Sequence, residues 1–481
     1  MKLRHKAISA TFWSAAQNFG VRLIAFAVLL ILTRLLTPAD FGLIALLAVV
    51  LALFQLLAEQ GFEEAIVQRS ELQKQHADTA FWVSALLGLI STCVLAGTAS
   101  QVADLLNEPR LAIFITVVSP TLLITSLSRV QVGLLRRDFA FRSLAYRQLI
   151  GAGAGGIVGI GMALNGFGAW SLIGRQMTET VVGSIVLWRV CDFRPGFDIS
   201  WRCFKDLFRF GSNLVLSQAL GFLSIRADSL IVHHFLGPVA LGYYSVGQRV
   251  FQLVLDLIHG PVNQVALSLF ARLQEDGARV AQAFMYAVRL TSLIAFPIFC
   301  LMAILNEELV AVVLGAKWAE ASPLVRVLAL GGILMVISYF NVTAIKAMGK
   351  PSWVLLLVAV NGVINLAGFL VAVRWGIAAV AAAFVIRAYA VYPLNFMLTQ
   401  RLIPITWRGY LREIAPALTG SAAAAAVTMV AVSVTAELSP AWRLAIGASL
   451  GAVTYAVVLR CAFPAAPAAI VEVVKALVRS K

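Results

Sequence analysis

The sequence is poor in charge and in cysteine for its length. Only 13% of its 481 residues are Asp, Glu, Lys or Arg, whereas soluble proteins carry about 25%. The five cysteines are scattered and form no Cys-x-x-Cys pair or His/Cys cluster, which argues against a disulfide framework or a zinc site. The chain also lacks a GxxxxGK[ST] phosphate loop and any connection long enough for a soluble domain. We therefore expect no cofactor and no built-in ATP-driven motor.

Long apolar stretches dominate the sequence instead. Hydrophobic residues make up 60% of the chain, and the mean hydropathy is +0.89. A helix that spans a membrane needs about 20 apolar residues, and about fourteen stretches reach that length. They are 11–35, 39–60, 79–102, 111–135, 143–165, 168–190, 207–236, 239–266, 281–304, 322–346, 351–373, 376–399, 413–435 and 440–462. We therefore predict an all-α polytopic membrane protein embedded in the lipid bilayer, whose first stretch is an uncleaved span rather than a signal peptide.

The basic residues lie mainly at the ends of these stretches. The net charge is +15 and the isoelectric point is about 10. About 25 Lys and Arg residues fall on the two termini and the even-numbered connections, and about six fall on the odd-numbered ones. This bias predicts that both termini lie in the cytoplasm. No basic stripe alternates with aromatic residues, so nucleic acid is not an expected partner.

A proline/glycine hairpin occurs twice. The run from Arg34 to Gly42 (RLLTPADFG) is repeated in the run from His234 to Gly242 (HFLGPVALG), with the Pro and the final Gly at matching positions. Each run begins at the end of an apolar stretch, and that stretch is the first in a set of six predicted spans. We therefore expect two parallel six-helix bundles, residues 1–200 and 201–405, followed by two further helices and a basic cytoplasmic tail in 406–481.

These hairpins resemble those of the polysaccharide-export flippases, which belong to the MOP (multidrug/oligosaccharidyl-lipid/polysaccharide) exporter superfamily. The resemblance extends to the number of helices, the short loops and the repeat. It implies a V-shaped pair of six-helix bundles around a central cavity. It also implies that the substrate is an undecaprenyl-pyrophosphate-linked oligosaccharide, moved from the cytoplasmic to the periplasmic leaflet of the inner membrane for lipopolysaccharide or exopolysaccharide synthesis. A polysaccharide polymerase and other assembly proteins are then expected partners.

One charge lies near the centre of the first apolar stretch. Placing an arginine such as Arg22 at the middle of a membrane helix costs about 2.5 to 3.5 kcal/mol on insertion scales. At 100° per residue, Thr11, Ser14 and Asn18 fall on the same helical face as Arg22. A polar face that ends in a cation predicts that this side of the helix borders a wet cavity rather than lipid.

Two more polar stripes occur at membrane depth on the predicted spans 207–236 and 239–266. The first consists of Asn213, Ser217, Ser224 and Asp228, and the second of Arg249, Gln252, Asp256, His259 and Asn263. The members of each stripe fall on one side of a helix. The family resemblance implies that the first two spans of each bundle line the cavity, which agrees with the placement of all three stripes.

The chemistry of a diphosphate suggests roles for these side chains. Arginine stays charged and binds phosphate oxygens through a bidentate fork, so Arg22 and Arg249 are the predicted diphosphate ligands. The predicted partners of sugar hydroxyls are Asn18, Gln252 and Asn263, and the predicted groups for charge balance or for a coupling proton or sodium ion are Asp256, Asp228 and His259. Alternatively, the two arginines pair with Asp256 or Asp228 and serve only to hold the bundles together.

Other functions remain as alternatives. A drug or metabolite antiporter of the same superfamily and a lipid II flippase share the expected architecture. A membrane glycosyltransferase or polysaccharide polymerase would need a catalytic carboxylate or a large external loop, and the segments 104–110 and 307–326 are both short. We therefore do not expect an enzyme.

Two local patterns are interpreted without a ligand. Glu59, Glu63 and Glu64 close the inner end of the second span, where we expect a solvated helix end, with a gate as the alternative role. Gly151, Gly155 and Gly159 recur every four residues, a spacing that predicts close packing between two helices.

Overall fold

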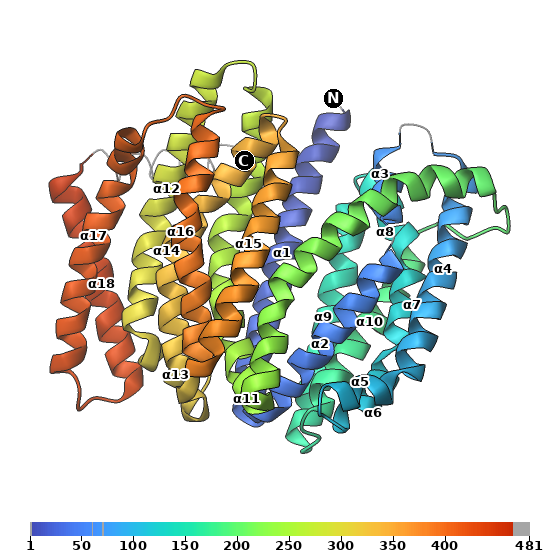
Figure 1. Ribbon diagram of the computed structural model, residues 1–481, viewed down its shortest axis with the longest axis horizontal. Coiled ribbons are helices and arrows are strands. Elements are labelled where there is room, and N and C mark those ends of the chain that lie inside the picture. The colour runs from blue at the N-terminus through green and yellow to red at the C-terminus, as the bar shows by residue number, and fades with distance from the viewer. Residues whose placement is uncertain (1, 60, 70–71, 465–481) are drawn as a thin grey trace. The chain divides into compact units, whose positions relative to one another are not determined.

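The computed structural model describes residues 2–59, 61–69 and 72–464, and this part of the chain consists of helices and loops without a strand (Figure 1). Eleven of the described helical segments are long and apolar enough to cross a membrane. The predicted class, an all-α polytopic membrane protein, is confirmed. Each predicted apolar stretch falls on helical residues, while the count of fourteen spans stays a prediction.

The chain folds into two compact units, Met1–Gly242 and Tyr243–Lys481. Helix α11 (Trp201–Arg272) contains a kink at Gly237, whose φ of 81° and ψ of 179° are not helical. Glycine has no Cβ, so it adopts this backbone conformation without the steric penalty that other residues meet. The kink separates the two spans that the sequence predicted on this segment. The predicted division into two six-helix bundles and a two-helix extension stays a prediction.

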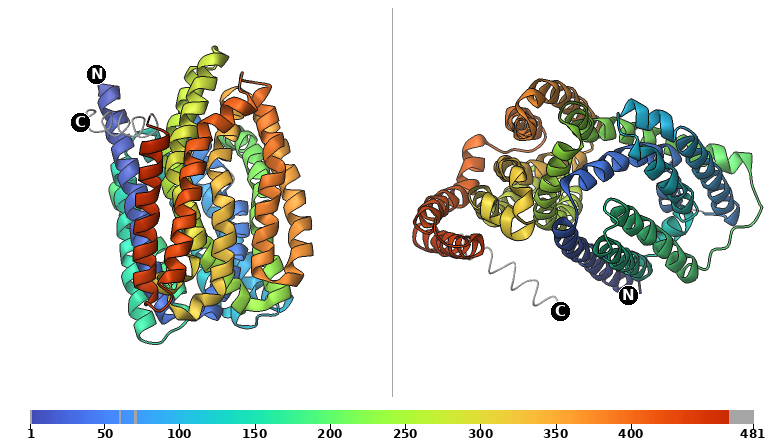
Figure 2. Two further views of the ribbon diagram at one scale, coloured as in Figure 1. Left: turned by 90° about the vertical axis from the view of Figure 1, so that its left-hand side faces the viewer. Right: turned by 90° about the horizontal axis from the view of Figure 1, so that it is seen from below.

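The first unit is built from α-helices. Its helices before α11 are α1 (Lys2–Leu35), α2 (Pro38–Glu59), α3 (Phe62–Gln68), α4 (Lys74–Gly97), α5 (Ala99–Leu105), α6 (Arg110–Val118), α7 (Pro120–Ser126), α8 (Arg129–Arg137), α9 (Phe141–Leu164) and α10 (Trp170–Val190). Helix α9 packs against both α1 and α10, and α4 packs against α2 and α7 (Figure 2). The predicted span 111–135 thus comprises three consecutive helices, α6 to α8, and Pro120 begins the second because it cannot donate a backbone hydrogen bond.

The glycine pattern of α9 forms the contact with α10. A Cβ on Gly155 would lie 2.7 Å from the carbonyl oxygen of Arg175, and one on Gly151 would lie 2.9 Å from that of Glu179. A Cβ on Gly159 would meet the side chain of Arg175 at 2.8 Å. The predicted close packing is confirmed, because any larger residue would push the two helices apart.

The first proline/glycine hairpin begins α2 with a reciprocal cap. The Thr37 backbone N–H and hydroxyl donate to the Asp40 carboxylate at 2.9 and 2.7 Å, and the Asp40 N–H donates to the Thr37 hydroxyl at 3.3 Å. This arrangement is a capping box, and Pro38 at the first helical position needs no hydrogen-bond acceptor. The second hairpin lacks these polar residues and turns at Gly237 instead.

The two hairpins also contact each other. A Cβ added to Gly42 would overlap the carbonyl oxygen of Pro238, and a Cβ added to Gly242 would overlap the carbonyl oxygen of Pro38. The repeated Pro and Gly positions therefore form one reciprocal backbone contact within the first unit. Only glycine permits this approach of two backbones.

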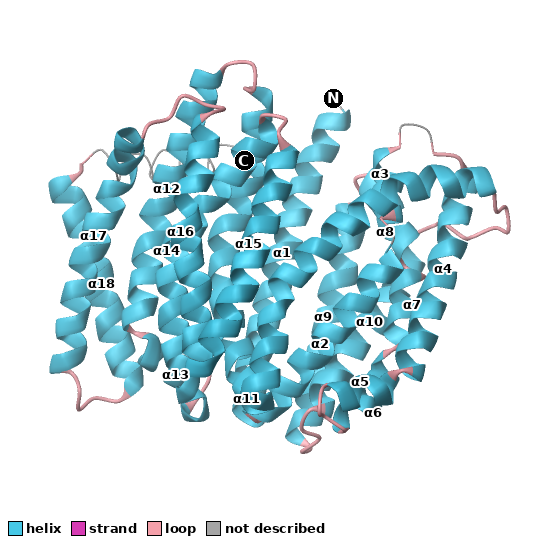
Figure 3. Cartoon of the chain, in the orientation of Figure 1, coloured by secondary structure: helices cyan, strands magenta, loops and turns pink. Residues whose placement is uncertain are grey.

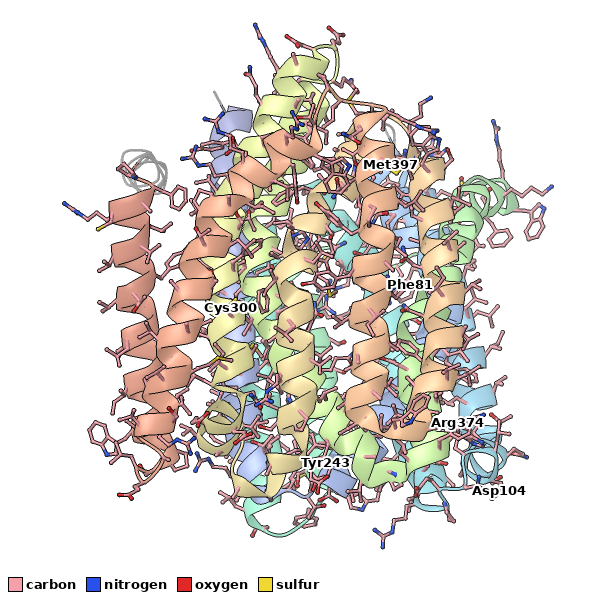
Figure 4. All side chains as sticks on the ribbon, turned by 60° about the vertical axis from the view of Figure 1, so that its left-hand side comes forward. Phe81, Asp104, Tyr243, Cys300, Arg374 and Met397 are labelled. Atoms are coloured by element: carbon pink, nitrogen blue, oxygen red, sulfur yellow. The ribbon has the colours of Figure 1, made fainter. Side chains whose placement is uncertain are left out.

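The second unit continues from α11 with a further set of helices. They are α12 (Gly277–Ile304), α13 (Asn306–Val313), η1 (Ala316–Ala321), α14 (Ser322–Ala347), α15 (Pro351–Ala372), η2 (Val373–Trp375), α16 (Ile377–Gln400), α17 (Trp407–Val434) and α18 (Pro440–Ala462). Short loops join them (Figure 3). Helix α14 packs against α12 and α16, and α17 packs against α12 and α18. Met397 lies near the end of α16, and Arg374 lies on η2 just before its start (Figure 4). The 24 residues of α16 span about 36 Å, enough to cross a hydrocarbon core of about 30 Å.

Candidate functional site

The polar face of α1 is turned away from α9. Trp13 meets the ring of Tyr146 on α9 edge-on at 5.5 Å, and Gly20 packs against the same helix. At 100° per residue, Asn18 lies about 140° and Arg22 about 180° from Trp13 around the helix axis. Asn18 is exposed and Arg22 is half-buried. These two predicted ligands therefore lie on a side of α1 that does not pack against α9.

The stripe on the second half of α11 lies on continuous helix, as predicted. Arg249 and Gln252 are exposed, whereas Asp256 and His259 are half-buried. The Gln252 amide donates to the Asp256 carboxylate at 2.9 Å. The ring of His259 stacks on Tyr339 of α14, with 3.7 Å between ring centroids and 20° between planes. Tyr339 was not found from the sequence, since it lies on a distant helix with no spacing that links it to His259.

Asp228 on the first half of α11 is buried. Its carboxylate accepts hydrogen bonds from the backbone N–H and the hydroxyl of Ser229, at 2.6 and 3.2 Å. Nearby, the ring of His233 hydrogen-bonds to the carbonyl oxygen of Leu106 at 2.8 Å, which joins α11 to the end of α5. The predicted stripe residues whose side chains lie outside the described part of the structure are Asn263, Asn213, Ser217, Ser224, Thr11 and Ser14.

The prediction that Glu63 is solvated was wrong. Glu63 on α3 is 7% exposed and lies 2.6 Å from Arg136 and 3.6 Å from Arg129, both on α8. Burial raises the pKa of the Glu63 carboxyl above its usual value, and the two arginines act in the opposite direction. Glu64 is exposed, as expected. The sequence could not reveal the Glu63 contacts, because its partners come from a helix on the far side of two apolar spans.

Two arginines on the long apolar helices of the second unit have partners that sequence analysis did not identify. Arg387, near the middle of α16, donates to the Asn361 side-chain oxygen at 2.6 Å and lies 4.8 Å from the ring centroid of Phe384. Arg289 on α12 lies 3.9 Å from Glu413 on α17. An amide and an aromatic face thus stabilise the charge of Arg387, and a carboxylate stabilises that of Arg289.

Comparison with known proteins identifies the family. Residues 31–323 match the polysaccharide biosynthesis protein family. The succinoglycan biosynthesis transport protein ExoT of Rhizobium meliloti (strain 1021) is 26% identical over 339 residues, which cover 70% of this chain and 68% of that protein. The teichuronic acid biosynthesis protein TuaB of Bacillus subtilis (strain 168) is 22% identical over 469 residues, covering 95% and 96%. The lipopolysaccharide biosynthesis protein WzxC of Escherichia coli (strain K12) is 23% identical over 347 residues, covering 69% and 68%.

Solved structures with the same fold are membrane transporters. The lipid II flippase MurJ in an inward closed conformation has a TM-score of 0.75 at 12% identity and covers 93% of this chain and 98% of its own. An inward-facing multidrug resistance MATE family transporter of the MOP superfamily has a TM-score of 0.65 at 18% identity, covering 79% and 94%. Identities this low show the fold only. Together with the family match, they establish that the chain belongs to the polysaccharide biosynthesis protein family and has the MOP exporter fold.

Proposed function

We propose that this protein is a flippase that moves a lipid-linked oligosaccharide across the bacterial inner membrane for lipopolysaccharide or exopolysaccharide synthesis. The observation that carries the proposal is the family match over residues 31–323, which includes both proline/glycine hairpins. Relatives named for succinoglycan transport and for lipopolysaccharide biosynthesis support it, as does the fold shared with a lipid II flippase. In this proposal the protein transports its substrate and does not transform it.

The proposed substrate is an oligosaccharide linked to undecaprenyl pyrophosphate. Its transfer requires that two phosphate charges pass through a region of low dielectric, where an unpaired charge is costly. Arg22 and Arg249 are the proposed diphosphate ligands, because a guanidinium keeps its charge and donates two parallel hydrogen bonds to phosphate oxygens. Arg22 is half-buried on the side of α1 turned away from α9, and Arg249 is exposed, so their placement supports the proposal.

The proposed sugar contacts are amides. Asn18 and Gln252 are exposed, so they can meet hydroxyl groups of an oligosaccharide, and Asn263 is proposed for the same role from its position in the stripe. Amides suit this task because each carries both donors and an acceptor. Their hydrogen bonds add no charge to the transport path.

Carboxylates and an imidazole are the proposed balancing groups. Asp256 and Asp228 would neutralise the arginines after the substrate has left, and His259 would carry a coupling proton, with sodium as the alternative ion. The hydrogen bond from Gln252 to Asp256 supports this role, since it holds the carboxylate on the same side of α11 as Arg249, about two turns along the helix. The competing structural role, in which the arginines only pair with these acids, predicts no loss of transport when stability is preserved.

We further propose that transport proceeds by alternating access with both termini in the cytoplasm. Rocking of two bundles around a fixed site is the general mechanism of transporters built from repeats. The C55 tail of the substrate would remain in the bilayer while the charged part crosses. The product would then reach a polysaccharide polymerase and assembly proteins on the periplasmic side.

The test is export in a strain that lacks the chromosomal copy. Arg22→Ala and Arg249→Ala should each abolish surface polysaccharide at unchanged protein level, while Lys at either position should restore part of it, because lysine keeps the charge but loses the fork. Arg279→Ala is the matched control, since Arg279 lies in the first turn of α12, is 71% exposed and pairs with Asp276, the residue that caps this helix. Normal export from both alanine variants would contradict the proposed roles of Arg22 and Arg249 as diphosphate ligands.

A further inference from the structure

A cavity of about 530 Å³ lies within the second unit, and none of the predicted substrate-binding residues lines it. One wall is a face of the first turns of α12, and the other is formed by the loop before α17 and by α17 itself. Ala278 and Ala281 contribute only methyl groups to the wall, which leaves the space open. Tyr286 lines the cavity and is 45% exposed. The cavity is therefore an open depression between two helices that pack on each other below it.

Opposite charges line this cavity. Arg289 Nε and Glu413 Oε2 are 3.9 Å apart, and their side chains are 27% and 32% exposed. Charge-assisted hydrogen bonds are about 2.7–2.9 Å long, so these two atoms attract each other without forming one. Within the described part of the chain, Glu413 has this ion pair and no hydrogen-bond donor. Its carboxylate can therefore accept hydrogen bonds from a bound molecule.

The two charges lie where α12 and α17 change from charged to apolar sequence. Arg289 is the last charged residue of α12, and the remainder to Ile304 is apolar except for Thr291 and Ser292. Glu413 is likewise the last charged residue before the apolar remainder of α17, which ends at Val434. Each helix thus changes from charged to apolar at this point, as helices do where hydrocarbon meets the headgroup region. A ligand with charges in the cavity and apolar chains beside it matches these surroundings.

We propose that this cavity binds the headgroup of phosphatidylethanolamine, a phospholipid with a primary ammonium group. The ammonium would donate hydrogen bonds to Glu413, and the phosphate would accept them from Arg289. The acyl chains would leave the open side of the cavity past the ring of Tyr286, which lines it and is 45% exposed. A neighbouring cation and anion complement a zwitterion better than they complement an anionic lipid, which would be repelled by Glu413. The proposal does not depend on the flippase function.

The first test compares headgroups on the unaltered protein. Purified full-length protein in detergent is titrated with phosphatidylethanolamine, its mono- and dimethylated forms, phosphatidylcholine and phosphatidylglycerol, all with identical acyl chains, and bound lipid is measured by native mass spectrometry. The quaternary ammonium of phosphatidylcholine has no N–H to donate. We expect phosphatidylethanolamine to bind at least about fivefold more tightly than phosphatidylcholine, with the methylated forms in between, as the loss of hydrogen bonds to a charged group predicts. Equal binding of these two lipids, or tightest binding of phosphatidylglycerol, overturns the proposal.

The second test assigns the preference to the cavity. Glu413→Gln should reduce the ratio of phosphatidylethanolamine to phosphatidylcholine binding to near one, because the neutral amide no longer attracts the ammonium. Glu307→Gln is the matched control, since Glu307 forms an ion pair of similar length, 3.7 Å, with Arg326 at a site away from the cavity. It should leave the ratio unchanged. A binding ratio that is unchanged in Glu413→Gln, or that falls equally in the control, overturns the assignment to this cavity. If Glu413→Gln does not fold, the comparison of headgroups on the unaltered protein tests the proposal by itself.

Discussion

Replacing Gly42 or Gly242 by alanine tests the contact between the two proline/glycine hairpins. The added Cβ would overlap the carbonyl oxygen of Pro238 in the first case and that of Pro38 in the second. Both obstacles are backbone atoms, which cannot rotate away as the end of a flexible side chain can. Alanine therefore fits only if the hairpins move apart, and every other contact of the hairpins is strained or lost with that movement.

Two opposing effects set the expected magnitude. Replacing glycine by alanine inside a helix stabilises it by about 0.5–1 kcal/mol, because alanine loses less backbone entropy on folding. Inserting a methyl group into a tightly packed site costs about 1–3 kcal/mol. Since the obstacle is backbone, we expect a cost near the upper end and a net loss of about 2–2.5 kcal/mol for each variant.

The reciprocal geometry adds a prediction for the double variant. Once one alanine has separated the two backbones, the second meets less obstruction. The double variant should therefore lose less stability than the sum of the two single losses, as expected for residues that share one contact. Independent sites would give an additive loss.

The assay is denaturant-induced unfolding of the purified protein in detergent micelles. Gly153→Ala on α9 is the matched control, because no atom lies within 4 Å of a Cβ at that position and alanine should stabilise the helix by about 0.5–1 kcal/mol. If Gly42→Ala and Gly242→Ala stabilise the protein as the control does, the hairpins do not pack as described. Fully additive losses would refute the shared contact.

Two further predictions concern contacts that the sequence did not reveal. Glu63→Ala removes the acid that pairs with two arginines of α8 and should lower the free energy of unfolding by about 1–3 kcal/mol, less than for a fully buried pair because Arg136 is half exposed. Glu64→Ala, at an exposed site, should change the free energy of unfolding by less than about 0.5 kcal/mol. Equal effects of the two variants in thermal unfolding would contradict the burial of Glu63. Tyr339→Phe keeps the ring that stacks on His259 and should be tolerated, whereas Tyr339→Ala should cost about 0.5–1.5 kcal/mol beyond the lost burial; equally stable variants would show that the stacking contributes nothing.

Much of the fold follows from local patterns in the sequence. Runs of about 20 apolar residues are sufficient to predict the membrane helices, because hydrocarbon leaves no other partner for the backbone polar groups. The repeated Pro and Gly positions marked both hairpins and carried the family resemblance, and the capping hydrogen bonds between Thr37 and Asp40 are local to the first of them. The polar stripe on the second half of α11 was visible because a helix places residues three or four apart on the same side.

The limits of sequence analysis appear where partners are distant along the chain. Glu63 follows an apolar span and looked like a solvated helix end, yet α8 folds over it and supplies two arginines. His259 was found in its stripe, but its ring partner Tyr339 lies on α14. The cavity beside Glu413 exists only because the loop before α17 meets the first turns of α12.

The sequence by itself determined that this protein is a helical membrane protein of the polysaccharide biosynthesis family, and it located the charges that must be stabilised in the bilayer. Those properties depend on hydrophobic length and helical periodicity, which act over neighbouring residues. Only the tertiary structure decided which carboxylate meets which arginine, and that the repeated glycines bring two backbones into contact. Such contacts depend on how helices pack in three dimensions, where small differences in side-chain volume and position select one partner among many.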